Sequence, residues 1–544
     1  MGERNDERQD APPHSAPRID SRDGSRARSD PAIGWRRDRP FQIVFAALLV
    51  ATSALFWFFE YLPLQDLPQH LALNSVVVHF GDAARQTSRY YEWDFSAWTY
   101  LGFRLFNWLF GLLATPMIAM RLYLTLYALL LPLAMLRLLA ATGRNHWLSL
   151  FAFPLVLNTN LHWGFLSFCL GAALVCLALA QHERQLSATR RSLSVGQALF
   201  GLLLVVTHAQ AFLAWSVCLG LFFVVDRRYR LSMALCDLSP ASLLFVGWSA
   251  MKVGASGGVF HISQSSWLSV GQNWELFEHA IFLASNYEHG FFWERLWILC
   301  ATLTILPLLA GNIRHWREPN LPWIASLRYE LLTLVFVGLY FAMPYWIGVQ
   351  FCVNPRMLLF AALTIVAAIK SPLDGRVGRY LARPALALVA VAYLVLNASI
   401  FFGFQQRVGD FERALATIPP GRRLLPMAFT RSPLFTRRID FSHFGGYYVA
   451  AKGGLVPMLW EANGVRVKPR YRFWPDDWMG YRFSYDRFGR YFHYFLFRDA
   501  GRFGREHPLR SVSPGRVELL FRSPHWEVWR NRHPVEPPVP GSKR

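Results

Sequence analysis

The sequence has few lysines and few acidic residues, and its cysteines form no recognisable motif. Only five of the 56 basic residues are lysines, and 35 acidic residues leave a formal net charge of +21. The six cysteines lie in or beside apolar runs without a CxxC pair, which argues against a disulfide framework or a cysteine metal site. Charged residues make up only 17% of the chain, against about 25% in typical soluble domains.

Long hydrophobic runs are abundant instead. Hydrophobic residues make up 53% of the chain and the mean hydropathy is +0.22. Many runs approach the ~20 residues that cross a bilayer as a helix. We therefore predict a polytopic α-helical membrane protein with about eleven transmembrane helices. The predicted spans are residues 41–62, 117–138, 147–161, 163–181, 193–208, 211–225, 232–252, 292–311, 330–347, 355–370 and 383–402.

The basic residues predict the orientation of these spans. Arg36, Arg37 and Arg39 directly precede the first run, so the positive-inside rule places the N-terminus in the cytoplasm. The later basic loops are also expected in the cytoplasm, so the spans between them cross the membrane in outward and return pairs. An odd number of spans then puts the C-terminal segment outside. We expect the apolar run 96–113 to lie on the outer leaflet or dip into it. The protein is expected in the cell (inner or plasma) membrane.

Composition divides the chain into four parts. Residues 1–35 are polar and predict a disordered cytoplasmic N-terminus, with no signal-peptide cleavage pattern after the first run. Residues 36–402 form the membrane domain, in which 63–116 is the first extracytoplasmic loop with surface helices. Residues 403–532 predict a small extracytoplasmic α/β domain with strands near 491–497, 517–521 and 526–530, which are rich in aromatic residues and Val or Leu, and 533–544 predict a disordered tail. Arginine with aromatic residues also suits nucleic acid, but the outer location favours anionic headgroups or a glycolipid acceptor.

Asp66 stands out among the acidic residues. It follows the first span and lies between Pro63, which ends that helix, and Pro68, which is suited to open the next one. We expect that next helix to lie on the membrane surface from Leu67 to Phe80. Two interpretations of Asp66 are open: it caps the helix at Leu67, or its carboxylate performs chemistry at the membrane edge.

Other polar residues collect on the same predicted side of the membrane. They are His70, His162, His208, Arg104 and Arg356. Arg356 opens a span at its outer end, where a guanidinium can fork onto two phosphate oxygens or extend to bulk headgroups. His208 is either a substrate group or a satisfied histidine at a helix turn. The histidines lack the HxxxH or HExxH spacing of a zinc site, so we predict no metal ligands among them.

The order of these features resembles the GT-C superfamily of membrane glycosyltransferases. The resemblance rests on the cytoplasmic start of the first span, the carboxylate at its outer end, the long first loop and the motif 117–123 (MIAMRLY), and it covers roughly residues 36 to 400. The superfamily includes protein mannosyltransferases and enzymes that add arabinose-type sugars to lipid A. The resemblance implies transfer of a sugar from a polyprenyl phosphate to an extracytoplasmic acceptor, with Asp66 as the general base. Only Glu92-Trp93-Asp94 approaches a DxD motif, so a divalent metal is possible and no cofactor is assigned.

Such a reaction needs a base near the acceptor hydroxyl and a cation near the departing phosphate. Asp66 is the predicted catalytic residue, and Arg356 is predicted to bind the donor phosphate. His70, His162, His208 and Arg104 are predicted to bind substrate. The alternatives are a non-catalytic transporter or flippase of an amphipathic anion, and a structural membrane protein. The predicted partners are the lipid donor, the bilayer and an outer acceptor, without nucleic acid.

Overall fold

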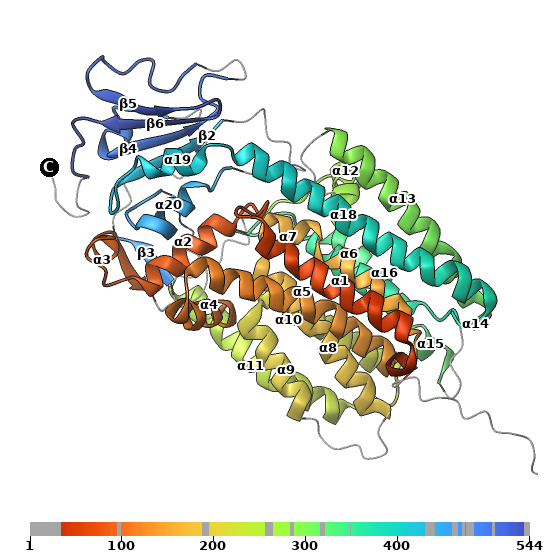
Figure 1. Cartoon of the computed structure of the whole chain (residues 1–544). Helices are drawn as coiled ribbons and strands as arrows, with labels where there is room; N and C mark the ends of the chain where they lie inside the picture. The colour runs from red at the N-terminus through yellow and green to blue at the C-terminus, as the bar shows by residue number, and fades with distance from the viewer. Residues whose placement is uncertain are drawn as a thin grey trace, which may run out of the picture.

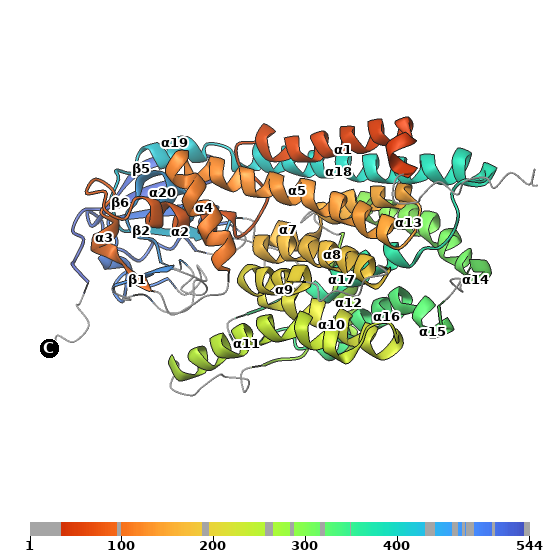
Figure 2. The ribbon, with the colours of Figure 1, turned by 90° about the horizontal axis from the view of Figure 1, so that it is seen from below.

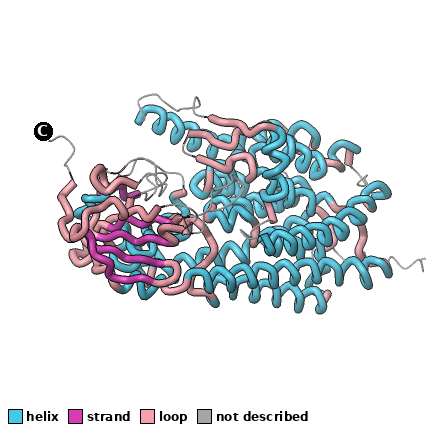
Figure 3. The backbone as a smooth tube through the Cα atoms, turned by 90° about the horizontal axis from the view of Figure 1, so that it is seen from above, coloured by secondary structure: helices cyan, strands magenta, loops and turns pink. Residues whose placement is uncertain are grey.

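A bundle of helices makes up most of the molecule, and a small β-sheet lies at one end of it (Figures 1 and 3). The computed structural model describes residues 34–94, 100–187, 195–255, 265–282, 288–315, 321–348, 350–429, 441–457, 459, 466–470, 474, 483–502 and 506–537. Most of the predicted disordered N-terminus (1–33) and part of the predicted tail (538–544) lie outside these residues.

Six of the described helices are long and apolar enough to cross a membrane. They are α1 (Arg39–Phe58), α5 (Pro116–Ala141), α8 (Leu166–Ser187), α11 (Leu231–Ala255), α13 (Glu288–Ala310) and α18 (Arg383–Val408). Proline in the first turn fixes the start of α1, α5 and α18. Asp38 and Thr115 cap α1 and α5, since their side chains accept hydrogen bonds from Phe41 and Ile118.

Shorter apolar helices complete the bundle. They are α4 (Leu101–Leu113), α9 (Val195–Thr207), α10 (Ala209–Val225), α16 (Arg328–Ala342) and α17 (Arg356–Ala368). In Figure 2, α1 and α18 run side by side along one edge of the bundle, whereas α9, α10 and α11 form the opposite edge. The remaining short elements of the bundle are η1 (Gly34–Arg37), η2 (His146–Phe151), α6 (Ala152–Val156), α7 (Thr159–Trp163), α12 (Val270–His279), α14 (Asn312–His315), α15 (Trp323–Ser326) and the π-helix η4 (Gly378–Ala382).

Ten of the eleven predicted spans coincide with a single helix, but the predicted span 147–161 does not. It is broken into η2, α6 and the start of α7. The side chain of Asn158 caps α7 and also donates to the carbonyl of Leu155 at 2.6 Å, and the Tyr127 hydroxyl donates to the carbonyl of Val156 at 3.1 Å. These side chains satisfy the backbone groups that a break in a buried helix leaves open.

The helix predicted from Leu67 to Phe80 is α2 (Leu67–Val78), and nine of its residues are buried. It is covered by α20 (Gly445–Lys452) from the C-terminal segment (Figure 1). Gly446 permits this close approach, because a Cβ atom there would lie 2.3 Å from the carbonyl oxygen of Pro68.

The C-terminal segment forms a four-stranded mixed sheet in the order β2-β4-β6-β5. Its strands are β2 (Leu424–Ala428), β4 (Tyr494–Arg498), β5 (Val517–Arg522) and β6 (Trp526–Asn531), accompanied by α19 (Phe411–Ala416) and η6 (Gly489–Tyr491). β2 runs parallel to β4, and the other two pairs are antiparallel. The strands predicted near 491–497, 517–521 and 526–530 are therefore present.

Besides the packing of α20 on α2, further contacts join this segment to the rest of the chain. The indole nitrogen of Trp526 donates to the carbonyl of Val408, the last residue of α18, at 2.7 Å. A two-stranded ribbon of β1 (Tyr91–Asp94) and β3 (Arg466–Pro469) links the C-terminal segment to the first loop, which also contains α3 (Thr87–Tyr90). The sheet thus lies at the same end of the bundle as Asp66.

Candidate active site

Asp66 is completely buried at the junction of α2, α7 and α20. Its backbone N–H donates to the carbonyl of Trp163 at 3.2 Å, and its carbonyl accepts from the N–H of His70 at 3.1 Å. Gly164 follows α7 with φ of +93°, and a Cβ atom there would lie 2.6 Å from the Cβ of Asp66. The turn after α7 therefore clamps Asp66 in place, and only glycine fits at that contact.

The Asp66 carboxylate does not cap α2, although Asp66 occupies the N-cap position. No hydrogen bond joins the side chain to the start of the helix, and φ and ψ of Asp66 are −91° and −3° rather than extended. Both carboxylate oxygens are buried, with no hydrogen-bond partner among the described residues. The capping interpretation of this residue is therefore wrong.

A histidine from the C-terminal segment faces the carboxylate. Nε2 of His443 lies 3.5 Å from Oδ1 of Asp66. On its other side, Nδ1 of His443 lies 2.9 Å from the amide nitrogen of Gln69, one turn along α2 from Asp66. With this amide as donor, the neutral imidazole carries its hydrogen on Nε2, directed at Asp66.

The burial of these groups changes their acidity. Loss of solvation raises the pKa of Asp66 well above the ordinary carboxyl range, and the charge of Arg356 opposes this rise. Burial lowers the pKa of His443 to about 4. The imidazole is thus neutral at physiological pH, and the carboxyl group is a stronger base than an exposed aspartate.

Arg356 is the first residue of α17 and is almost fully buried. Its guanidinium lies 4.0 Å from the ring centroid of Phe165, the residue after Gly164. Nη1 donates to Oε1 of Gln210 at 3.2 Å, and Nη2 donates to the carbonyl of Phe351 at 3.2 Å. These neutral partners hold the guanidinium in place, and no carboxylate of the described residues is bonded to it.

His208 lies at the turn between α9 and α10, next to Gln210, which binds Arg356. Its Nδ1 accepts from the backbone N–H of Gln210 at 3.1 Å, so the side chain caps α10. Its Nε2 lies 3.2 Å from the hydroxyl of Tyr100. Gln210 therefore links the positions of His208 and Arg356.

His70 and Arg104 contact the elements that surround Asp66. Nε2 of His70 lies 3.1 Å from the carbonyl oxygen of Gly164, and burial lowers the pKa of this histidine to about 3. The His70 ring packs edge-on against Phe103 in α4, with centroids 5.0 Å apart. The next residue, Arg104, donates to Oδ1 of Asn74 in α2 at 3.0 Å. Both side chains thus belong to the layer of polar groups around α2.

His162 is placed differently from the other predicted substrate residues. Its Nε2 lies 3.0 Å from Oδ1 of Asn397 in α18, and its Nδ1 lies 3.2 Å from the carbonyl oxygen of Pro63. The side chain is completely buried. These contacts fix the turn before Asp66 against α18, so we leave His162 out of the residues proposed below to contact substrate.

The described residues contain no group of three His, Cys, Asp or Glu side chains suited to holding a metal ion. Glu92, in the motif considered for metal binding, lies in β1 with its carboxylate 3.9 Å from Nη1 of Arg470. The side chain of Asp94 lies outside the described part of the chain. We assign no role to a metal in the chemistry below.

Sequence reasoning missed His443, and it left Gln69, Gln210 and Tyr100 without an assigned role. Gln69 and His443 are 374 residues apart, and no motif spacing connects them. The one local signal is Gly445-Gly446, directly after His443 and Phe444, because paired glycines at the start of a helix can mark a close approach of two backbones.

Comparison with known proteins identifies the fold. No protein-family model and no curated protein matches the sequence. The crystal structure of ArnT from Cupriavidus metallidurans, bound to undecaprenyl phosphate, is similar with a TM-score of 0.55 and 11% identity, over 93% of this chain and 100% of that chain. The arabinofuranosyltransferase AftD from Mycobacteria gives a TM-score of 0.45 and 14% identity over 90% of this chain, which spans 40% of the length of AftD. The similarity to ArnT shows that this chain shares the overall fold of that structure, and this agrees with the resemblance stated from the sequence.

Proposed function

We propose that this protein is a membrane glycosyltransferase that moves a sugar from a polyprenyl-phosphate donor to an extracytoplasmic acceptor, with Asp66 as the general base. One observation carries the proposal: a completely buried carboxylate, clamped by Gly164, accepts no hydrogen bond from the described residues and faces the neutral imidazole of His443. Leaving a buried acid unsatisfied costs folding stability. Such a cost is expected where a group must receive a proton during a reaction.

The reaction follows from the properties of this carboxylate. The acceptor hydroxyl gives its proton to Asp66 as its oxygen forms a bond to the anomeric carbon of the sugar. The bond from that carbon to the donor phosphate breaks, and the electron pair leaves with the phosphate oxygen. Because burial raises the pKa of Asp66 above the ordinary carboxyl range, its carboxylate takes the proton more readily than an ordinary aspartate.

Arg356 is proposed to bind the phosphate and stabilise the charge that it gains. Its held guanidinium and the absence of a bonded carboxylate suit an incoming dianion. The bound undecaprenyl phosphate in the ArnT structure supports a lipid phosphate as the partner. His70 and Arg104, in the polar layer around α2, and His208, linked to Arg356 through Gln210, are proposed to bind the sugar and the acceptor.

The C-terminal segment is proposed to complete the site from the extracytoplasmic side. It supplies His443 directly, and α20 covers α2. In this topology the N-terminus is cytoplasmic and the sheet is outside. Cysteine labelling should find a cysteine placed at Arg144 or Arg228 accessible from the cytoplasm, and one at Arg510 from outside.

The proposal is tested by incubating purified protein in detergent with a radiolabelled polyprenyl-phosphate sugar and a mixture of envelope lipids. We expect release of polyprenyl phosphate and a labelled product that depends on the protein. If the donor is only moved across reconstituted vesicles and never consumed, the protein is a transporter and the proposal fails.

A further inference from the structure

A cavity of about 290 Å³ opens between α5, α8 and α9, far from Asp66. α8 begins at Leu166, two residues after Gly164, and its cavity-lining residues lie between Leu177 and Arg184. At ~1.5 Å per residue, the cavity lies roughly 17–27 Å along α8 from the candidate active site. This separation is close to the thickness of the hydrocarbon core, so the two features belong to opposite leaflets.

The lining of the cavity is divided into an apolar and a basic part. Leu133 of α5, Leu177 of α8 and Phe200 of α9 form the apolar wall. Arg137, Gln181 and Arg184 form the polar end. Arg137 lies one turn after Leu133, and Gln181 and Arg184 lie one and two turns after Leu177, so each helix presents both kinds of side chain on one face.

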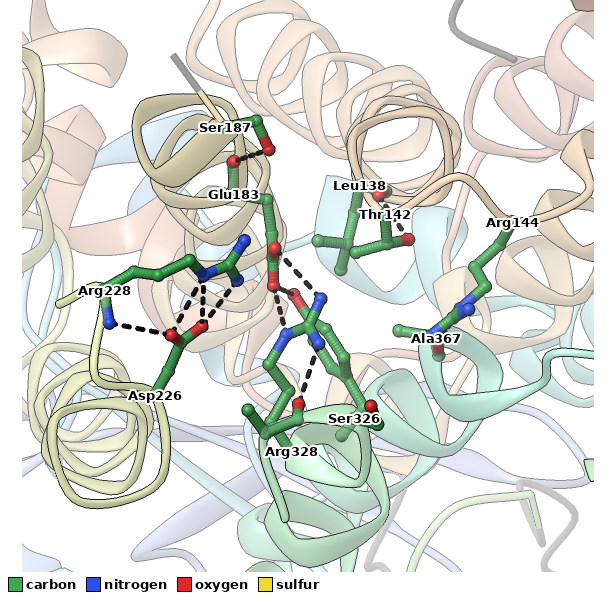
Figure 4. Close-up of polar contacts among 12 residues, drawn as sticks. Leu138, Thr142, Arg144, Glu183, Ser187, Asp226, Arg228, Ser326, Arg328 and Ala367 are labelled. Atoms are coloured by element: carbon green, nitrogen blue, oxygen red, sulfur yellow. Dashed lines mark hydrogen bonds and ion pairs between the residues drawn. The ribbon is translucent and has the colours of Figure 1, made fainter. Parts of the chain in front are cut away.

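The two arginines of the cavity keep their charge uncompensated. Neither side chain makes a hydrogen bond or ion pair with any residue that the structure describes. Two described acids at this end of the bundle, Glu183 and Asp226, bind other arginines (Figure 4). Glu183 binds Arg328 through two contacts of 2.8 and 3.1 Å, and Asp226 binds Nε of Arg228 at 3.0 and 3.1 Å.

Exposed leucines continue from the cavity along the helices. Leu126 and Leu133 lie on one stripe of α5 with Arg137, and they are 38% and 40% exposed. On α9, Leu199 and Leu203 are 59% and 42% exposed. Since both helices are apolar and bundle-forming, these side chains face lipid rather than water, and they lead from the basic end towards the middle of the membrane.

We propose that this cavity is a binding site for an anionic phospholipid of the leaflet opposite to the active site. The phosphodiester lies between Arg137 and Arg184, which donate charge-assisted hydrogen bonds, and Gln181 binds the headgroup. The acyl chains follow Leu126, Leu133, Leu199 and Leu203. Basic pockets between transmembrane helices are known as sites for such headgroups. The volume suits a headgroup, because whole drug-sized ligands occupy about 300–1,000 Å³.

The test compares the wild type with the double variant Arg137→Gln/Arg184→Gln. The control is Arg227→Gln/Arg230→Gln, which removes the same charge from exposed positions between α10 and α11, outside the cavity. Delipidated protein is titrated with phosphatidylglycerol, phosphatidylcholine or inorganic phosphate. Thermal unfolding and native mass spectrometry then report the retained lipid.

We expect phosphatidylglycerol to raise the unfolding temperature of the wild type and the control equally, with one or two lipids retained. The cavity variant should lose at least about tenfold in affinity, which is the effect of removing two charge-assisted contacts. Phosphatidylcholine should shift none of the proteins. An equal effect of phosphatidylglycerol on both variants would overturn the site, and a shift of equal size with inorganic phosphate would show a free-anion site instead of a lipid site.

Discussion

Two carboxylates are buried at opposite ends of the helical bundle, and their surroundings differ. Glu183, in α8, accepts from Nε and Nη2 of Arg328 at 2.8 and 3.1 Å (Figure 4). It also accepts from the hydroxyl of Tyr329 at 2.9 Å. Asp66 is at least as buried, yet both of its oxygens lack a hydrogen-bond partner among the described residues. Its nearest ionisable neighbour in the described structure is His443, at 3.5 Å.

The contrast separates a structural acid from a candidate catalytic one. A buried charge is tolerated when a cation and hydrogen bonds replace its lost solvation, and Glu183 has both. Asp66 has neither within bonding distance, so its ionised form is disfavoured and its pKa is raised by burial. If this interpretation is right, changes at Glu183 damage folding, whereas changes around Asp66 damage turnover.

The largest effect is expected at the structural acid. Glu183→Gln leaves Arg328 buried without a counter-charge, which should cost about 3–5 kcal/mol of folding free energy. The measurement is the yield of folded protein and its thermal unfolding in detergent. Adding Arg328→Met to Glu183→Gln should recover part of the loss, because neither position then carries a buried charge. If Glu183→Gln had wild-type stability, Glu183 would not be a structural acid and its contrast with Asp66 would not hold.

The next largest effect is expected at Arg356, which is proposed to bind the phosphate of the donor. Arg356→Ala should lower kcat/KM for the lipid donor by about a hundredfold, which is typical for loss of one group that stabilises developing charge. Arg356→Lys should retain part of the activity, because one ammonium replaces a planar fork that also stacks on Phe165. Steady-state kinetics normalised to folded protein provide the check. Unchanged use of the donor by Arg356→Ala would identify the arginine as a structural residue.

A smaller effect is expected at His443. An N–H directed at a carboxylate favours its ionised form, so His443→Leu should raise the pKa of Asp66 further and move the acidic limb of the pH profile to higher pH. We expect kcat/KM at pH 7 to fall by about tenfold. The matched control is His525→Ala, which changes a half-exposed histidine paired with Asp499 in the C-terminal sheet region. A pH profile identical to that of the wild type would exclude His443 from the site.

The smallest effect is expected at Glu60, an exposed acid that lies close to Asp66 in sequence. A hydrogen bond with Glu412 and partial burial raise the pKa of Glu60 to about 7. Because the folded-state pKa is raised, its contribution to stability is present below about pH 4.5 and is lost as the pH rises through about 7. Glu60→Gln should remove this pH dependence, change stability at pH 7 by less than about 1 kcal/mol and leave turnover unaltered. Loss of turnover in Glu60→Gln would mean that Glu60 takes part in the reaction, and it would contradict the assignment of Asp66 as the general base.

The sequence was sufficient to predict the elements whose signals are local. Apolar runs located the six long helices, and the prolines around Asp66 identified the turn that carries it. The aromatic and branched residues near 491–497, 517–521 and 526–530 predicted strands of the C-terminal sheet, which the structure places at 494–498, 517–522 and 526–531. Each of these features depends on neighbours within about ten residues.

Features that depend on distant contacts were not predictable. The break of the span 147–161 is stabilised by Tyr127 of another helix, and the burial of α2 depends on α20. His443 reaches Asp66 only because α20 packs over α2, a contact permitted by Gly446. Periodicity and motif spacing carry no information about such pairs, so the partner of the central carboxylate could not be assigned from the sequence.

The most direct test of the central claim measures transfer activity and thermal stability of Asp66→Asn on the same purified sample. Asparagine keeps the shape of aspartate but cannot accept a proton at neutral pH. It also removes the cost of ionising a buried group whose folded-state pKa is raised, so stability at pH 7 should equal or exceed that of the wild type. We predict a loss of transfer of about a hundredfold or more with undiminished stability. Wild-type transfer by the Asn variant would contradict the assignment of Asp66 as the general base.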